Sequence, residues 1–168
     1  RIFANTNAAA AGGVLAALIA SQLYHGKADL TMALNGALAG LVSITAEPLM
    51  PTLGAATLIG GIGGLIVVFS VPLLDRLQID DVVGAIPVHL LAGIWGTLAV
   101  CLTNGDASLV TQIFGIVVIG VFTFIASYIV WLILDAFMGL RVSEEDEMKG
   151  MDLSELGMES YPDFNTSK

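Results

Sequence analysis

Residues 109–134 read LVTQIFGIVVIGVFTFIASYIVWLIL, 26 residues without a single Asp, Glu, Lys, Arg or His. Four other runs have the same character, and only one of them contains an ionisable side chain, His89: residues 4–24, 30–46, 53–74 and 82–102. A helix needs about 17 to 25 apolar residues to cross the hydrocarbon core of a bilayer. The sequence therefore predicts an all-α protein, a polytopic membrane helix bundle in residues 1–140, followed by a tail in residues 141–168.

The composition excludes most soluble classes. Hydrophobic residues make up 56% of the chain and charged residues only 12%, about half the charged share of a soluble domain. Of the net charge of −9, the stretch 142–168 contributes −6, because it holds eight acidic residues and two lysines. No cluster of Lys and Arg remains that would favour nucleic-acid binding.

Motifs for cofactor or enzyme chemistry are also missing from the sequence. It has no spacing of metal ligands, no phosphate-binding loop and no Gly-x-Ser-x-Gly elbow. The single cysteine, Cys101, lies in an apolar run and is interpreted as a packing residue. We therefore expect neither a cofactor nor an enzymatic activity.

Pairs of glycines recur four residues apart in two of the apolar runs, at Gly36 and Gly40 and at Gly60 and Gly64. Small residues at this spacing let helix backbones approach closely in lipid, where no hydrophobic force draws helices together. We interpret these glycines as positions of tight helix packing.

The positive charges predict an orientation, because cytoplasmic loops retain Lys and Arg. If the five helices alternate in direction, one side of the membrane receives Lys27, Arg76, Arg141, Lys149 and Lys168, whereas the loops 47–52 and 103–108 have no basic residue. The acidic tail is then cytoplasmic. An odd number of helices and a first residue that is Arg, not Met, are typical of half of a longer polytopic protein.

His89 is the one ionisable side chain well inside a predicted span. It follows Asp81 by eight residues, or roughly 12 Å of helical rise, near the middle of a ~30 Å core. Such residues usually face a cavity, a partner or a substrate path, and a neutral imidazole both donates and accepts a hydrogen bond. Two alternatives stay open: a histidine bonded to a neighbouring helix, and an intramembrane hydrolase that pairs His89 with Ser43 or Ser70.

Four other ionisable residues lie near predicted helix ends. Asp80 and Asp81 open the helix that carries His89, and we expect them to cap its free amides. Asp135 ends the last helix six residues before Arg141, and we interpret it as a charge partner at the water interface. Glu47 is interpreted as a solvated helix end.

Residues 79–98, IDDVVGAIPVHLLAGIWGTL, resemble the tenth transmembrane helix of the Amt/Mep/Rh ammonium transporters, with its Asp-Asp pair, pore histidine and Gly-x-x-Gly. Residues 5–12 resemble the seventh helix of the family and residues 35–45 the eighth. The tail is similar to the family's regulatory tail in residues 139–142, 144–145, 150–154 and 159–161. The chain thus resembles helices seven to eleven of an eleven-helix, inverted-repeat ammonium transporter.

The resemblance implies that His89 is the second of the family's twin pore histidines and that Leu38 and Ala85 line the pore. It also implies structural or regulatory roles for Asp80, Asp81, Asp135, Arg141, Gly150, Asp152 and Tyr161. Transport of ammonium, a homotrimer in the cell (inner) membrane and a PII-type signalling partner at the tail follow from it, with an ammonium sensor as the alternative. Three positions depart from the family pattern, which often has Pro, Gly and His there: Val82, Leu90 and Leu156.

Overall fold

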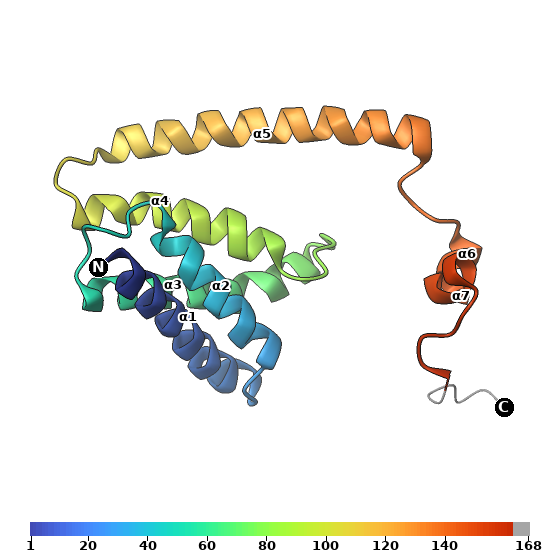
Figure 1. Ribbon diagram of the computed structural model, residues 1–168, viewed down its shortest axis with the longest axis horizontal. Helices are drawn as coiled ribbons and strands as arrows, with labels where there is room; N and C mark the ends of the chain where they lie inside the picture. The colour runs from blue at the N-terminus through green and yellow to red at the C-terminus, as the bar shows by residue number, and fades with distance from the viewer. Residues whose placement is uncertain (163–168) are drawn as a thin grey trace. The chain divides into compact units, whose positions relative to one another are not determined.

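Helices form all of the regular structure in residues 1–162, the part of the chain that the computed structural model describes (Figure 1). Lys168, one of the five basic residues that predicted the orientation, lies outside this range. The elements in chain order are α1 (Ile2–His25), α2 (Leu30–Thr45), α3 (Leu53–Arg76), the π-helical turn η1 (Ile86–Leu91), α4 (Ala92–Thr103), α5 (Leu109–Met138), α6 (Glu144–Lys149) and α7 (Met151–Leu156).

Four segments of residues 1–162 are long and apolar enough to cross a membrane: α1, α3, α5 and the continuous helix made by η1 and α4 (Ile86–Thr103). The all-helical membrane bundle predicted from the sequence is confirmed. Of the five predicted spanning helices, these four are confirmed to be long enough to span. The fifth, α2, has 16 residues, one short of the ~17 that usually suffice.

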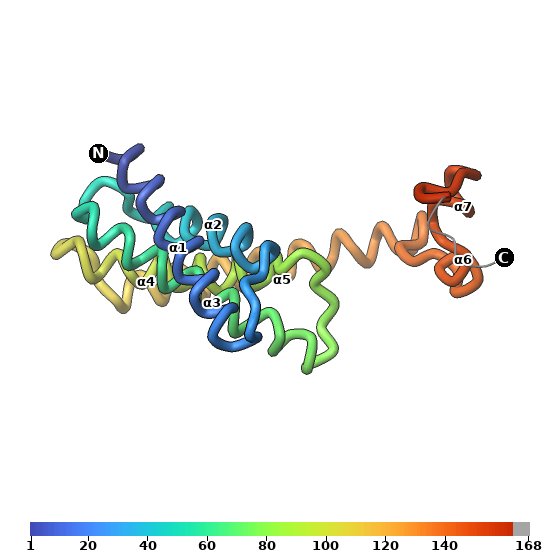
Figure 2. The backbone as a smooth tube through the Cα atoms, turned by 90° about the horizontal axis from the view of Figure 1, so that it is seen from below, coloured from blue at the N-terminus to red at the C-terminus, as the bar shows by residue number. Residues whose placement is uncertain are grey.

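The chain forms two compact units, Arg1–Ile119 and Gly120–Lys168, and the boundary between them falls inside α5. In the first unit α1 packs against α2 and α3, and these two helices also contact each other. Both backbone views show α1, α2 and α3 side by side (Figures 1 and 2). The segment η1–α4 packs mainly on α2 and α3, and Trp95 and Ala99 of α4 join a core cluster that includes Ala9 of α1.

Glycines allow α1, α2 and α3 to approach so closely, as their spacing predicts. A Cβ atom built on Gly36 would lie 2.5 Å from the Cβ of Ala17 and 2.6 Å from the carbonyl oxygen of Gly13. Atoms added at Gly40 and Gly60 would both collide with the backbone carbonyl of Ala9. The prediction of tight packing at these glycines is confirmed.

Polar side chains join the helices of the first unit to its loops. Asn5, 2% exposed, donates from Nδ2 to the carbonyl oxygens of Pro48 (2.9 Å) and Pro51 (2.8 Å). Glu47 is half-buried: its carboxylate accepts hydrogen bonds from the amides of Leu49 and Met50 and from the Asn104 side chain. Glu47 thus lies just beyond the end of α2 and is partly exposed, and its carboxylate also satisfies donors of the following loop and of Asn104.

Candidate functional site

His89 lies in η1, close to the start of its helix. The sequence predicted helix from residue 82, but the chain from Leu77 to Gly84 is not helical and η1 begins at Ile86. The expected 12 Å of helical rise between Asp81 and His89 is therefore wrong. At the end of η1 the amide of Ala92 donates to the carbonyl of Pro87, five residues back. This wider turn is often found at functional segments.

Asp81 caps the start of this helix. Its two carboxylate oxygens accept hydrogen bonds from the amides of Ala85 and Ile86, both at 2.8 Å. These are first-turn donors that have no partner inside the helix. The side chain of Asp80 is exposed and forms no such bond to residues 1–162, so the capping expected of the pair is performed by Asp81.

The three residues expected to line a pore surround one pocket. Leu38 belongs to α2 and His89 to η1, and Ala85 is the residue immediately before η1. The pocket holds about 100 Å³ and opens at the surface of the first unit. Its remaining lining residues are Asn35, Val83, Gly84 and Val88. A functional role for Asn35 was not predicted from the sequence, although a polar amide within an apolar run could have indicated one.

Carbon atoms dominate the wall of this pocket, and one imidazole, His89, and one amide, Asn35, interrupt it. Neither ring nitrogen of His89 is hydrogen-bonded to another residue of the described part of the chain. Within residues 1–162, the His89 ring is therefore not hydrogen-bonded to a neighbouring helix, as the first alternative required. The ring remains available to donate one hydrogen bond and accept another from a small solute.

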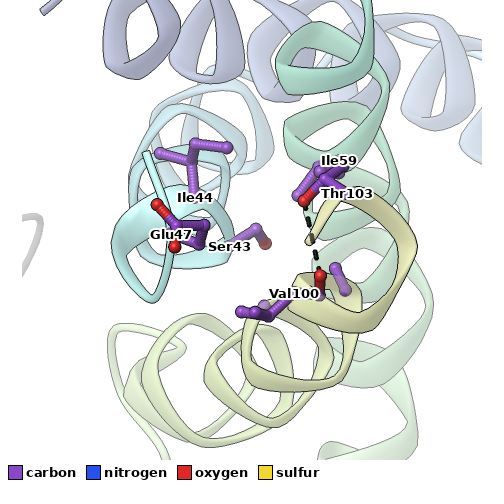
Figure 3. A pocket seen from close by; sticks show the side chains of 8 residues that line it. Ser43, Ile44, Glu47, Ile59, Val100 and Thr103 are labelled. Carbon is purple, nitrogen blue, oxygen red and sulfur yellow. Dashed lines mark hydrogen bonds between the residues drawn. The ribbon is translucent and has the colours of Figure 1, made fainter. Parts of the chain in front are cut away.

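A second pocket lies beside Ser43, between the end of α2 and α4 (Figure 3). The Ser43 hydroxyl is buried and has no hydrogen-bond partner in the described range, but the pocket has no room for a water molecule. Ser43 abuts Gly63 and Gly96, at which a Cβ would collide with it. It lines a different pocket from His89, and Ser70 donates to the carbonyl of Ile66, so neither serine is paired with the imidazole as the hydrolase alternative requires.

In the second unit, Arg141 pairs with Glu147, with Nη2–Oε distances of 3.0 and 3.1 Å. Asp135 accepts a hydrogen bond from the amide of Leu140 at the end of α5. The expected charge pair of Asp135 with Arg141 is therefore wrong, because Glu147 is the acidic partner of Arg141 in residues 1–162.

Asp152 organises the tail. Its carboxylate accepts the amides of Ser160 (2.8 Å) and Leu153 (3.0 Å), and these bonds lower the pKa of the Asp152 carboxyl below its ordinary value. Gly150 has φ +102, and a Cβ there would lie 2.7 Å from Asp152 Oδ1. Tyr161 lies exposed near the end of the described range. The hydrogen bond from the amide of Ser160 to Asp152 brings the chain after α7 back to the start of α7.

No group of three or more His, Cys, Asp or Glu side chains in residues 1–162 could hold a metal ion. The polar side chains that line the pocket at His89 are one imidazole, His89, and one amide, Asn35.

Comparisons with known proteins give one answer. The model of the Ammonium Transporter Family matches residues 1–161. The chain is 35% identical to ammonium transporter Amt2 of Archaeoglobus fulgidus over 97% of its own length, and 37% identical to ammonium transporter Amt1 of Haloferax mediterranei over 90%. Among solved structures, one titled "Sensor Amt Protein" superposes with a TM-score of 0.83 at 31% identity, covering 92% of this chain.

The relatives are much longer than the region matched. The chain spans 39% of the Archaeoglobus protein, 30% of the Haloferax protein and 41% of the solved chain. It therefore corresponds to less than half of each.

Proposed function

The chain belongs to the ammonium transporter family, and from this premise we propose that the whole protein carries ammonium across a membrane along a path lined by His89, Leu38 and Ala85. Residues 1–140 serve in transport, and residues 141–168 form a regulatory tail. The observation that carries the proposal is the pocket of about 100 Å³ that these three residues share.

The chemistry of the pocket favours a neutral, small solute. A cation that entered a wall of Leu38, Val83 and Val88 would lose its hydration without compensation, at a very large cost. Ammonia has no net charge and can exchange hydrogen bonds with one imidazole. We propose that ammonium gives up its proton before this point, that ammonia passes His89, and that the proton travels separately.

The test is uptake by the full-length protein, with His89→Ala beside wild type at matched membrane abundance. Loss of uptake, or of the discrimination between ammonium and methylammonium, supports the proposal. His25→Ala is the matched control, because His25 is the chain's other histidine and lies exposed at the end of α1. Unchanged uptake and discrimination in His89→Ala would leave His89 without a role in transport.

We extend the proposal to the protein's surroundings: a homotrimer in the cell (inner) membrane with a cytoplasmic C-terminus. Lys27 in the loop after α1 and Arg76 at the end of α3, against loops 47–52 and 103–108 without Lys or Arg, support that orientation. A PII-type signalling protein is the proposed tail partner. Chemical labelling of single cysteines placed at residues 27 and 105 in intact cells distinguishes the two orientations.

A second candidate is an ammonium sensor that signals through its tail, with transport secondary. It is favoured by the structural relative, whose title names it a sensor, and by the tail's own fold around Asp152. Truncation after Leu140 separates the two functions: a transporter keeps its uptake, whereas a sensor loses the ammonium response and retains only residual flux.

A further inference from the structure

We propose that Asn35 is a positioning residue that holds the entrance to η1 and thereby sets the direction of His89. The inference rests on the proposed function, since it concerns the pocket in which His89 would act. The amide group of Asn35 donates from Nδ2 to the carbonyl oxygen of Val83, 48 residues away, at 2.9 Å. Asn35 is 9% exposed and lines the same pocket as His89.

Gly84 and Pro87 together explain why this carbonyl needs an outside donor, since the chain up to Gly84 is not helical. In a regular α-helix the carbonyl of residue 83 would accept from the amide of residue 87. Proline has no N–H, and its ring displaces the carbonyl four residues before it. An unsatisfied carbonyl in a membrane-spanning unit is costly, and the Asn35 amide supplies the missing hydrogen bond.

Gly84 allows Asn35 to reach Val83. Its φ of +78 lies in the region that favours glycine, and a Cβ on Gly84 would come within 2.9 Å of Asn35 Nδ2. Leu38 follows Asn35 by three residues and shares its helix face. The face of α2 that lines the pocket therefore also fixes the backbone that leads to His89.

Two side chains, one acting as hydrogen-bond acceptor and the other as donor, thus form two ties that hold the entrance to η1. Asp81 satisfies the free amides of Ala85 and Ile86, and Asn35 satisfies the free carbonyl of Val83. Asp81 lies on the same segment as the amides it binds, whereas Asn35 belongs to α2. Of these two ties, the Asn35 bond is the one that joins the segment leading into η1 to α2, the opposite wall of the pocket.

The first experiment measures the ratio of methylammonium to ammonium uptake in the full-length protein at matched membrane abundance. Asn35→Leu keeps the side chain's size and removes the donor, and Asn35→Gln keeps the donor. We expect Asn35→Leu to change the ratio by about fivefold, the factor that one hydrogen bond is worth in an equilibrium, with partial recovery in Asn35→Gln. Asn5→Leu is the matched control: it removes another buried amide-to-carbonyl bond, to Pro48 and Pro51, away from His89.

Provided that His89→Ala alters uptake, an Asn35→Leu ratio that matches that of Asn5→Leu overturns the inference.

A second readout does not depend on transport. His89→Cys is combined with Cys101→Ala, and the rate of labelling at position 89 by a small water-soluble thiol reagent is compared with and without Asn35→Leu. A rate changed by Asn35→Leu and not by Asn5→Leu supports the positioning role, and equal rates overturn it. If His89→Ala leaves uptake unchanged while this labelling rate responds to Asn35, the proposed function fails and the positioning role stands.

Discussion

The indole Nε1 of Trp95 donates a hydrogen bond to the backbone carbonyl of Ile59, 3.0 Å away. Trp95 lies in α4 and Ile59 in the first half of α3, so this single bond ties two consecutive spans of the first unit. The ring also packs against a cluster of buried residues, Ala9, Ile44, Ala56, Ile59 and Ala99. Trp95 therefore combines apolar packing with one directional bond.

Replacement of Trp95 by Phe separates these two contributions. Phe retains most of the packing but cannot donate, so we expect the free energy of unfolding to fall by about 1 kcal/mol. Titration of the purified full-length protein from mild detergent into sodium dodecyl sulfate measures it. Trp131→Phe is the control, since the Trp131 indole has no hydrogen-bond partner in residues 1–162. An equal loss in both variants would contradict a specific role for the Trp95–Ile59 bond.

Gly60→Ala should destabilise the bundle of α1, α2 and α3. The added methyl group would collide with the backbone of Ala9, and the two helices must separate, at a cost of about 1 to 3 kcal/mol. Thermal unfolding of the detergent-solubilised protein reports the change. Gly54→Ala lies in the same helix with no atom within 4 Å of the new Cβ, and it should be neutral. Comparable losses at both positions would argue against close packing as the cause.

Much of this fold could be predicted from the sequence, because a bilayer allows few solutions. Charge-free runs of membrane length become helices, since backbone groups must pair within their own segment. Gly36 and Gly60 lie where helix backbones are in contact, and the spacing of the glycines in the sequence predicted this close packing. The run 30–46 was predicted to span like the others, but α2 ends at Thr45 with 16 residues, just below the usual length.

The start of the helix at η1 could not be predicted from hydropathy. Val82 and Val83 are apolar and extend the run, but Gly84 with φ +78 and Pro87 without an N–H keep this stretch out of the helix. The role of Asn35 could not be predicted either, because its partner, Val83, is 48 residues away. Such long-range bonds depend on how the helices pack, which a single sequence does not specify. Whether His89, Leu38 and Ala85 conduct a solute stays a prediction.

Asp81→Ala should weaken the start of the helix that carries His89. It removes the acceptors of two first-turn amides, and loss of such a cap costs about 0.5 to 2 kcal/mol. Hydrogen exchange at Ala85 and Ile86, measured by mass spectrometry of the full-length protein, should become faster. Asp80→Ala is the neighbouring control, because the Asp80 side chain is exposed and unbonded within residues 1–162. Faster exchange in both variants would point to a general charge effect instead of capping.

Asp152 makes the fold of the tail depend on pH. The amides of Ser160 and Leu153 favour the charged carboxylate, so the pKa of Asp152 is lower in the folded tail than in an unfolded one. Its contribution is complete above the ordinary carboxyl pKa and is lost as the pH falls through the lowered value. In protein labelled with ¹⁵N-serine, the amide resonance of Ser160 should keep its hydrogen-bonded shift at neutral pH and move upfield on acidification. Asp152→Asn retains an acceptor without the charge, so the same resonance should no longer follow this titration; an unaltered titration in Asp152→Asn would assign it to another group.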